Sequence, residues 1–201
     1  MFVAVLLGEE ARARLAVEVD RLRATERASG TLPEVVWVSP ANFHLTVKFL
    51  GAVDTDRVPD VERALAAAVA GVPAFELTLR GLGAFPSAAR PRVIWAGTAH
   101  GAAELADLAA CVERSLSPLG FPMEERAFSA HVTLGRVRTP RRNPRLAEAL
   151  AASASVELLS VPVARVSLMR SDLSPRGARY SELAGHPLGM GTLSERHRRF
   201  T

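Results

Sequence analysis

The sequence predicts an α+β protein of two lobes, each holding a mainly antiparallel sheet with helices on its outer face. Three observations support this prediction. The strand-like runs are joined both by short turns rich in glycine and proline and by amphipathic helices, which is typical of α+β folds. Each half of the chain supplies a long helix, then a strand that begins with histidine, then another helix. This weak internal repeat predicts lobes related by a pseudo-twofold axis, with a central cleft where a ligand would bind.

Length and composition favour one globular unit. The 201 residues can bury a substantial core, and 48% hydrophobic with 23% charged residues is an ordinary globular balance. We therefore treat residues 1–201 as a single bilobal domain with a mobile tail from about residue 190. The apolar start lacks a basic leader, and no charge-free run reaches membrane-spanning length. These features predict a cytoplasmic protein with no membrane partner. We take the protein to be a monomer, although nothing in the sequence determines its oligomeric state.

The first half alternates strands and helices. Residues 2–7 form an apolar run too short for a helix, and residues 9–27 repeat apolar side chains at helical spacing. Residues 35–38 form a second strand, which a Ser-Pro turn connects to a third strand starting near Phe43. A helix over residues 56–70 follows and ends at a Gly-Val-Pro stop.

The second half opens with a clean apolar/polar alternation over residues 75–80. Asn143 looks like an N-cap, because proline follows it at the first helical position. The other expected elements are strands over residues 92–97, 128–137, 156–169 and 178–183 and helices over residues 102–116 and 144–152.

Two of these strands carry the same pair of functional side chains. One begins His44-Leu-Thr46-Val and the other His131-Val-Thr133-Leu. Since side chains alternate along a strand, each histidine shares a face with its threonine. For either histidine alone, a structural, hydrogen-bonded imidazole is the simpler interpretation. Taken together, the strands predict one pocket built from two similar half-sites.

These half-sites suit acid–base chemistry on a phosphodiester. One neutral imidazole can deprotonate an attacking water or hydroxyl, while an imidazolium opposite protonates the departing oxygen. The hydroxyls of Thr46 and Thr133 can donate to the phosphoryl oxygens as charge develops. A strained 2′,3′-cyclic phosphate could be opened in this way without a metal ion.

The basic residues are almost all arginine, and Lys48 is the only lysine. Arginine binds phosphate through a bidentate fork, so the net charge of +4 is compatible with a nucleic-acid partner. Four arginines follow the second histidine strand and either track an RNA backbone or form a solvated loop: Arg138, Arg141, Arg142 and Arg145.

Both His-x-Thr-x segments resemble the paired signatures of the two-histidine (2H) phosphoesterases. Residues 42–51 (Asn-Phe-His-Leu-Thr-Val-Lys-Phe-Leu-Gly), 81–86, 91–95 and 177–180 also resemble, in the right order, one family among them. This family is the bacterial and archaeal RNA 2′,3′-cyclic phosphodiesterases, historically called 2′-5′ RNA ligases. The resemblance covers nearly the whole chain.

The resemblance implies a bilobal fold, no metal or nucleotide cofactor, and RNA ends as partners, such as tRNA fragments or oligonucleotides with a cyclic phosphate. It implies that His44 donates a proton to the leaving 3′ oxygen and that His131 is the base that activates water. Hydrolysis would leave a 2′-phosphate. If an RNA 5′-hydroxyl replaces water, the same site would make a 2′-5′ linkage without ATP.

The resemblance also implies substrate contacts five places after each histidine, where Phe49 would stack on a base and Arg136 would contact phosphate. Strict alternation puts both on the face opposite the histidines, so each strand must end, twist or bulge before them. The alternative for Phe49 is core packing. Lys48 would share the His44 face and either touch a phosphate or be solvated.

Other functions compete with this interpretation. The single lysine lies in neither a Lys-x-Asp-Gly nor a Gly-Lys context, which excludes an ATP-dependent ligase and a P-loop, and no zinc motif is present. Two alternatives stay open. One is a phosphodiesterase acting on a small cyclic phosphate or a 2′-5′ oligonucleotide. The other is a protein that binds RNA ends without turnover.

Overall fold

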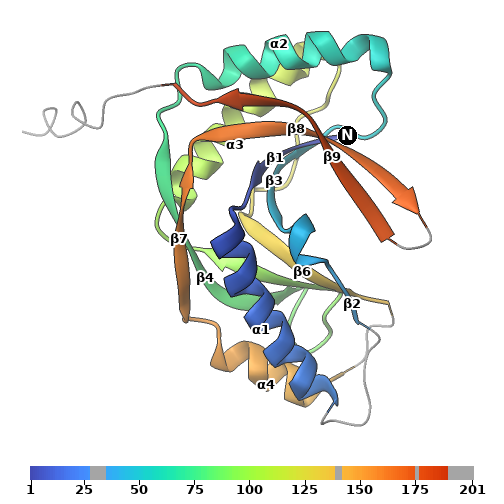
Figure 1. Ribbon diagram of the computed structural model, residues 1–201, viewed down its shortest axis with the longest axis vertical. Helices are drawn as coiled ribbons and strands as arrows, with labels where there is room; N and C mark the ends of the chain where they lie inside the picture. Colours follow the sequence, from blue (N-terminus) through green and yellow to red (C-terminus); the bar gives the residue numbers. More distant parts are fainter. Residues whose placement is uncertain (28–34, 139–141, 175–176, 190–201) are drawn as a thin grey trace, which may run out of the picture.

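The computed structural model describes residues 1–27, 35–138, 142–174 and 177–189 and has an α+β architecture (Figure 1). Its strands are β1 (Phe2–Leu6), β2 (Val35–Trp37), β3 (His44–Phe49), β4 (Phe75–Phe85), β5 (Val93–Thr98), β6 (His131–Val137), β7 (Glu157–Val163), β8 (Arg165–Ser174) and β9 (Gly177–Pro187). Its helices are α1 (Glu9–Arg27), α2 (Val58–Val69), α3 (Ala102–Leu116) and α4 (Pro144–Ala152). The expected α+β class is confirmed. The expected tail from residue 190 and Arg141 lie outside the described residues.

Antiparallel pairing joins nine strands of the described chain into one sheet, in the order β7-β4-β5-β6-β3-β1-β8-β9, with β2 added on β6. The two sheets expected from the sequence are therefore halves of one sheet. The halves meet where β3 pairs with β6, and the register there aligns Leu45 with Val132. The two histidine strands thus lie side by side at the centre of the molecule (Figure 1).

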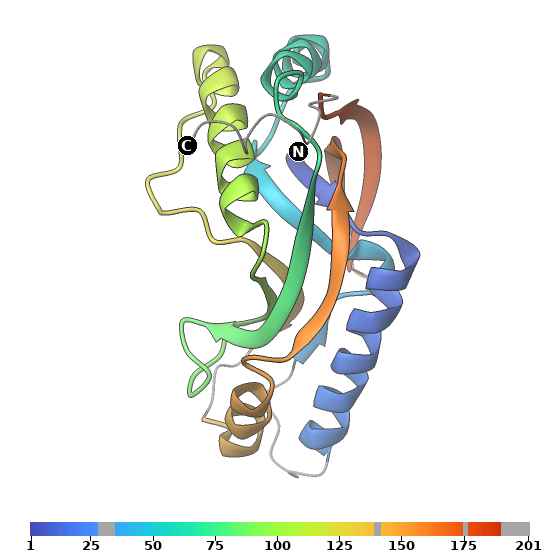
Figure 2. The ribbon, with the colours of Figure 1, turned by 90° about the vertical axis from the view of Figure 1, so that its left-hand side faces the viewer.

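The order of strands is symmetric about this junction. Reading outward, β3, β1, β8 and β9 on one side correspond to β6, β5, β4 and β7 on the other. The helices follow the same rule, because α1 and α2 flank β3 in the chain as α3 and α4 flank β6. Helices α2 and α3 pack together at one end, and α1 packs with α4 at the other (Figures 1 and 2). This arrangement has the pseudo-twofold symmetry that the sequence predicts.

The helices bury the apolar faces that their periodicity predicts. In α3 the side chains of Leu105, Leu108, Val112 and Leu116 are completely buried. The start of α4 is capped as expected, since the Asn143 side chain accepts a hydrogen bond from the backbone nitrogen of Leu146 at 3.0 Å. None of the helices in the described ranges is both long and apolar enough to cross a membrane.

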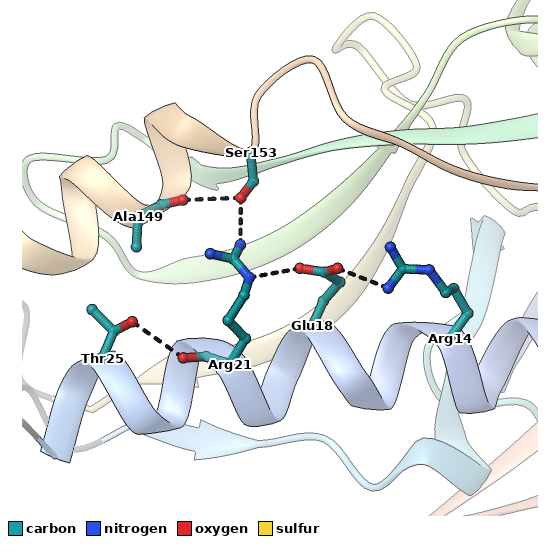
Figure 3. Close-up of polar contacts among 6 residues, drawn as sticks. All are labelled: Arg14, Glu18, Arg21, Thr25, Ala149 and Ser153. Carbon is teal, nitrogen blue, oxygen red and sulfur yellow. Dashed lines mark hydrogen bonds and ion pairs between the residues drawn. The ribbon is translucent and has the colours of Figure 1, made fainter.

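A polar network fastens α1 to the end of α4 (Figure 3). The nearly buried carboxylate of Glu18 accepts from Arg14 at 2.7 Å and from Arg21 at 3.0 Å. Burial opposes ionisation, but these two arginine hydrogen bonds hold the pKa of Glu18 below its ordinary value of 4.5. Arg21 also donates to the hydroxyl of Ser153, which donates in turn to the Ala149 carbonyl at 3.1 Å. The long helix of the first half is thus fixed to the second half.

Both histidine strands contain a bulge at the same place. The β1–β3 pairing passes from Lys48 to Thr46 in one step and leaves the intervening residue of β3 unpaired. The β5–β6 pairing passes from Gly135 to Thr133 and leaves out Leu134 in the same way. A bulge reverses the alternation beyond it, so residues after each bulge change face.

Lys48 shows the effect of the bulge in β3. It lies in the core at 5% exposure, where Nζ is 2.5 Å from a Glu113 carboxylate oxygen and donates to the Pro122 carbonyl at 2.7 Å. The expectation that Lys48 shares the His44 face was therefore wrong. The alternation rule failed because it ignored the extra residue.

We expect Lys48→Met to lower the free energy of unfolding by about 3 kcal/mol, because it leaves the Glu113 carboxylate nearly buried without its cation. A Lys48→Met/Glu113→Leu double variant should recover much of this loss. Urea denaturation measures both. As a control, Arg63→Gln breaks an exposed pair with Asp60 and should change little. A single variant as stable as the unmodified protein would contradict the assignment.

Candidate active site

The β3–β6 junction places the two half-sites on one face of the sheet. Leu45 and Val132 are paired and buried, so the side chains on either side of them point to the opposite face. In an antiparallel pair, moving one residue forward on one strand moves one residue back on the other. The register therefore places His44 opposite Thr133 and Thr46 opposite His131. All four side chains are half-buried. The structure therefore brings the predicted catalytic candidates together.

These four residues line one cleft of about 460 Å³, and Phe49 and Arg136 line it as well. The bulges explain why. Each inserts one residue between the threonine and the position five places after the histidine, and so returns that position to the histidine face. Phe49 is 70% exposed, so the alternative of core packing does not hold. Arg136 has no hydrogen bond or ion pair to any described residue, which leaves its guanidinium available to an anion.

The two imidazoles are held in the same way. Nδ1 of His44 lies 2.7 Å from the Asn42 carbonyl oxygen, and Nδ1 of His131 lies 2.8 Å from the Ser129 carbonyl oxygen. A carbonyl only accepts, so each Nδ1 must carry the proton and donate it. Nε2 of each ring is then the nitrogen that can accept or give up a proton. Both rings can act as base when neutral and as acid when charged.

Aromatic rings contact both imidazoles edge-on. The Tyr180 ring lies 5.3 Å from that of His44 at 89°, and the Phe85 ring lies 5.2 Å from that of His131 at 86°. Phe2 also contacts His44, with ring centroids 4.9 Å apart. These contacts hold each ring against its strand, so that a reacting group would meet an imidazole of fixed orientation.

Burial lowers the pKa of His44 below its ordinary value of 6.5. The Asn42 hydrogen bond opposes this shift, whereas the charges of His131 and Arg136 reinforce it. In the ligand-free cleft His44 is therefore neutral over a wider pH range than an ordinary histidine. An anion bound in the cleft would favour the imidazolium and raise the pKa again.

Several residues of the cleft were missed as site candidates. Phe2, Tyr180 and Ser171 come from β1, β9 and β8, and Phe85 comes from β4. Asn42 lines the cleft too, and its side chain donates to the backbone carbonyl of the β9 residue 178 at 3.0 Å. Asn42 lies two places before His44, but no spacing rule connects the other positions to His44. Only the position of Phe2 beside β3 follows from the pairing of neighbouring strands.

Among the described residues, no three His, Cys, Asp or Glu side chains are grouped so that they could hold a metal ion. The polar groups that face the cleft are imidazoles, hydroxyls, an amide and a guanidinium. They can donate, accept and transfer protons, and the guanidinium can balance the charge of a phosphate.

The paired His-x-Thr strands at the centre of a pseudo-symmetric antiparallel sheet place this chain in the class of 2H phosphoesterases. A family model described as LigT like Phosphoesterase matches residues 9–95 and 97–180. The chain therefore belongs to the LigT-like phosphoesterase family, as the sequence resemblance predicts.

Comparison with known proteins gives the same assignment. The RNA 2′,3′-cyclic phosphodiesterase of Aeropyrum pernix is 39% identical over 146 residues, which are 73% of this chain and 82% of that protein. A crystal structure from Thermus thermophilus aligns over 95% of this chain and 98% of its own, with a TM-score of 0.74 and 29% identity. The crystal structure of E. coli LigT complexed with 3′-AMP aligns over 93% and 96%, with a TM-score of 0.69 and 25% identity.

We expect an NMR titration of His44 to give a pKa below 6.5 in the phosphate-free protein. Arg136→Gln should raise this pKa, because it removes a positive charge that disfavours the imidazolium. Inorganic phosphate should raise it further. Arg63→Gln, on the exposed face of α2, is the control and should leave it unchanged. A pKa at or above 6.5 without phosphate would show that burial does not control this ring.

Proposed function

We propose that this protein hydrolyses RNA 2′,3′-cyclic phosphate ends to 2′-phosphomonoesters, with His44 as the proton donor and His131 as the base. The observation that carries the proposal is the matched pair of imidazoles. Both line one cleft, and each has its Nδ1 hydrogen held by a backbone carbonyl. The similarity of this chain to RNA 2′,3′-cyclic phosphodiesterases supports the same substrate.

In the proposed reaction His131 takes a proton from water through Nε2, and the water oxygen attacks phosphorus. The bond from phosphorus to the 3′ oxygen breaks, and His44 delivers a proton to that oxygen. The hydroxyls of Thr46 and Thr133 have no hydrogen-bond partner among the described residues, so they can donate to the non-bridging phosphoryl oxygens. Release of ring strain drives the opening.

The lowered pKa of His44 fits this role through substrate binding. Burial lowers the pKa of His44 and so favours the neutral ring, whereas a phosphodiester anion beside it would stabilise the imidazolium. The same anion would pair with the Arg136 guanidinium. It would thereby offset the positive charge that otherwise opposes protonation of His44. The donor is thus charged when the substrate is present.

The rest of the proposal concerns the partner. The cleft has a volume within the range of sites that bind small ligands, which is enough for a terminal nucleotide. E. coli LigT was crystallised with 3′-AMP, a nucleotide with a phosphate at the ribose. We propose that a single bilobal domain acts on RNA ends as a monomer in the cytoplasm, without a metal ion, and that an RNA 5′-hydroxyl can replace water to give 2′-5′ ligation.

We expect His44→Gln and His131→Gln each to lower the rate of cyclic-phosphate opening by roughly 10²–10⁴-fold, because each removes one proton-transfer group. The substrate is adenosine 2′,3′-cyclic phosphate with EDTA present, and phosphorus NMR identifies the 2′-phosphate product. His100→Gln replaces an exposed histidine outside the cleft and should retain full activity. Binding without turnover by the unmodified protein would instead indicate an RNA-end-binding protein.

A tRNA fragment ending in a cyclic phosphate, compared with the cyclic mononucleotide, distinguishes the remaining alternatives. An RNA-end enzyme should show the higher kcat/KM on the fragment. A preference for the mononucleotide would indicate a phosphodiesterase for small cyclic phosphates.

We expect Phe49→Ala to weaken the binding of a cyclic-phosphate-ended oligonucleotide by about 1–3 kcal/mol, the usual contribution of an aromatic ring to base stacking. Because Phe49 is 70% exposed, the same change should leave the unfolding midpoint nearly unaltered. Fluorescence anisotropy and thermal unfolding measure the two effects. A loss of stability without a loss of affinity would indicate a packing role instead.

A further inference from the structure

A second hollow adjoins the candidate active site beyond His131. It has a volume of about 480 Å³ and shares the side chains of His131 and Phe85 with the cleft. Thr133 of β6 lines the cleft, whereas Ser129, just before β6, lines the second hollow. His131 therefore marks the boundary between the two. We call this hollow the Trp95 pocket, after the largest side chain in its wall.

The symmetry of the site extends past the imidazoles. In the first half-site, the centroids of the Phe2 and Tyr180 rings lie 5.1 Å apart beside His44. In the second half-site, the centroids of the Trp95 and Phe85 rings lie 5.2 Å apart. Phe2 and Trp95 belong to β1 and β5, which are equivalent strands in the two halves of the sheet. Each histidine thus has an aromatic pair beside it: both rings of the first pair contact His44, and Phe85 of the second pair contacts His131.

The Trp95 ring is seated closely against glycine backbone. A side-chain carbon at Gly83 would lie 2.4 Å from this ring, and one at Gly97 would lie 3.0 Å from it. Any larger residue at Gly83 would displace the indole. The two glycines therefore let the ring lie flat on the β4–β5 surface, where it forms a wall of the pocket.

In-line phosphoryl transfer has two sides. The leaving oxygen departs from one side of phosphorus, and the nucleophile arrives from the other. In the proposed function His44 serves the leaving oxygen and His131 serves the nucleophile. Whatever group the nucleophilic oxygen carries must extend beyond His131, and the Trp95 pocket lies there. Water carries no such group, but an RNA 5′-hydroxyl carries a nucleoside.

The pocket has the lining that a nucleoside requires. Trp95, Phe85 and Phe128 supply aromatic surface for a base, and Thr98 supplies a hydroxyl. Arg80 stands in the same wall as a cation for the next phosphate of the chain. Its volume is close to that of the cleft, which we assign to the other nucleotide.

We propose that the Trp95 pocket binds the 5′-terminal nucleoside of a second RNA whose 5′-hydroxyl attacks the cyclic phosphate. The inference rests on the proposed function. His131 takes the 5′-hydroxyl proton as the 5′ oxygen bonds to phosphorus, and His44 protonates the 3′ oxygen as its bond to phosphorus breaks. The product is a 2′-5′ phosphodiester. In reverse, the same pocket holds the nucleoside released when a 2′-5′ linkage is cleaved.

The test separates the two nucleophiles. Ala154→Trp fills the Trp95 pocket from its exposed rim, and Arg80→Gln removes its cation; neither residue lines the cleft. Ala154→Trp should lower both joining to a 5′-hydroxyl oligonucleotide and cleavage of a 2′-5′ diadenosine monophosphate by roughly tenfold or more, the loss expected when one base is no longer stacked. Arg80→Gln should lower joining to the oligonucleotide, because the next phosphate of that chain loses its cation. It should leave cleavage of the diadenosine monophosphate nearly unchanged, because this substrate has no further phosphate. Hydrolysis of adenosine 2′,3′-cyclic phosphate should stay within about twofold.

Ala152→Trp is the matched control, since Ala152 is exposed near Ala154 but does not line the pocket. It should leave all three reactions unchanged. Variants that lower hydrolysis and joining equally, or change neither, would overturn the assignment. So would an unmodified protein that opens the cyclic phosphate but neither joins nor cleaves 2′-5′ linkages. An unmodified protein that opens no cyclic phosphate would instead refute the proposed function, and the pocket assignment with it.

Discussion

The pairing of β3 with β6 is the constraint on which the site depends. It joins the two halves of the sheet through Leu45 and Val132, whose side chains are buried in the core. Because a strand has a period of two, this one alignment directs both histidines and both threonines to the opposite face. A slip of one residue would send one half-site into the core. Burial of two apolar side chains thus sets the register of a polar site on the opposite face of the sheet.

The two bulges, one in each histidine strand, add further residues to the cleft. In β3 the bulge turns Phe49 toward the cleft and sends Lys48 to the core, where Glu113 neutralises it. In β6 the equivalent bulge turns Arg136 toward the cleft. One backbone irregularity therefore adds a cleft-lining position to each half-site. In β3 it also requires a buried ion pair, which a strand of regular alternation would not need.

The sequence predicted the features that follow from local periodicity. The α+β class, the four helices and the shared face of each His-Thr pair come from spacings of two and of three to four residues. Local periodicity could not place the bulges, because a bulge depends on the partner strand as well as on its own residues. The family resemblance required only that each strand end, twist or bulge before Phe49 and Arg136. The burial of Lys48 in the core and the pairing of the two expected sheets into one were missed for the same reason. Tyr180 lies far from His44 in the chain and reaches it only through the folding of β9 beside β8.

A symmetric scaffold must still give its two histidines different roles. Their backbone positions, their Nδ1 acceptors and their edge-on aromatic neighbours are closely matched, so none of these contacts distinguishes acid from base. The position five places after each histidine does, since it is Phe49 in one half and Arg136 in the other. Burial is the largest cause that disfavours the imidazolium of His44, and the Arg136 guanidinium adds to it until an anion binds. In the proposed mechanism the bound phosphate therefore favours the protonated form of His44, and the difference between Phe49 and Arg136 contributes to the asymmetry of the reaction.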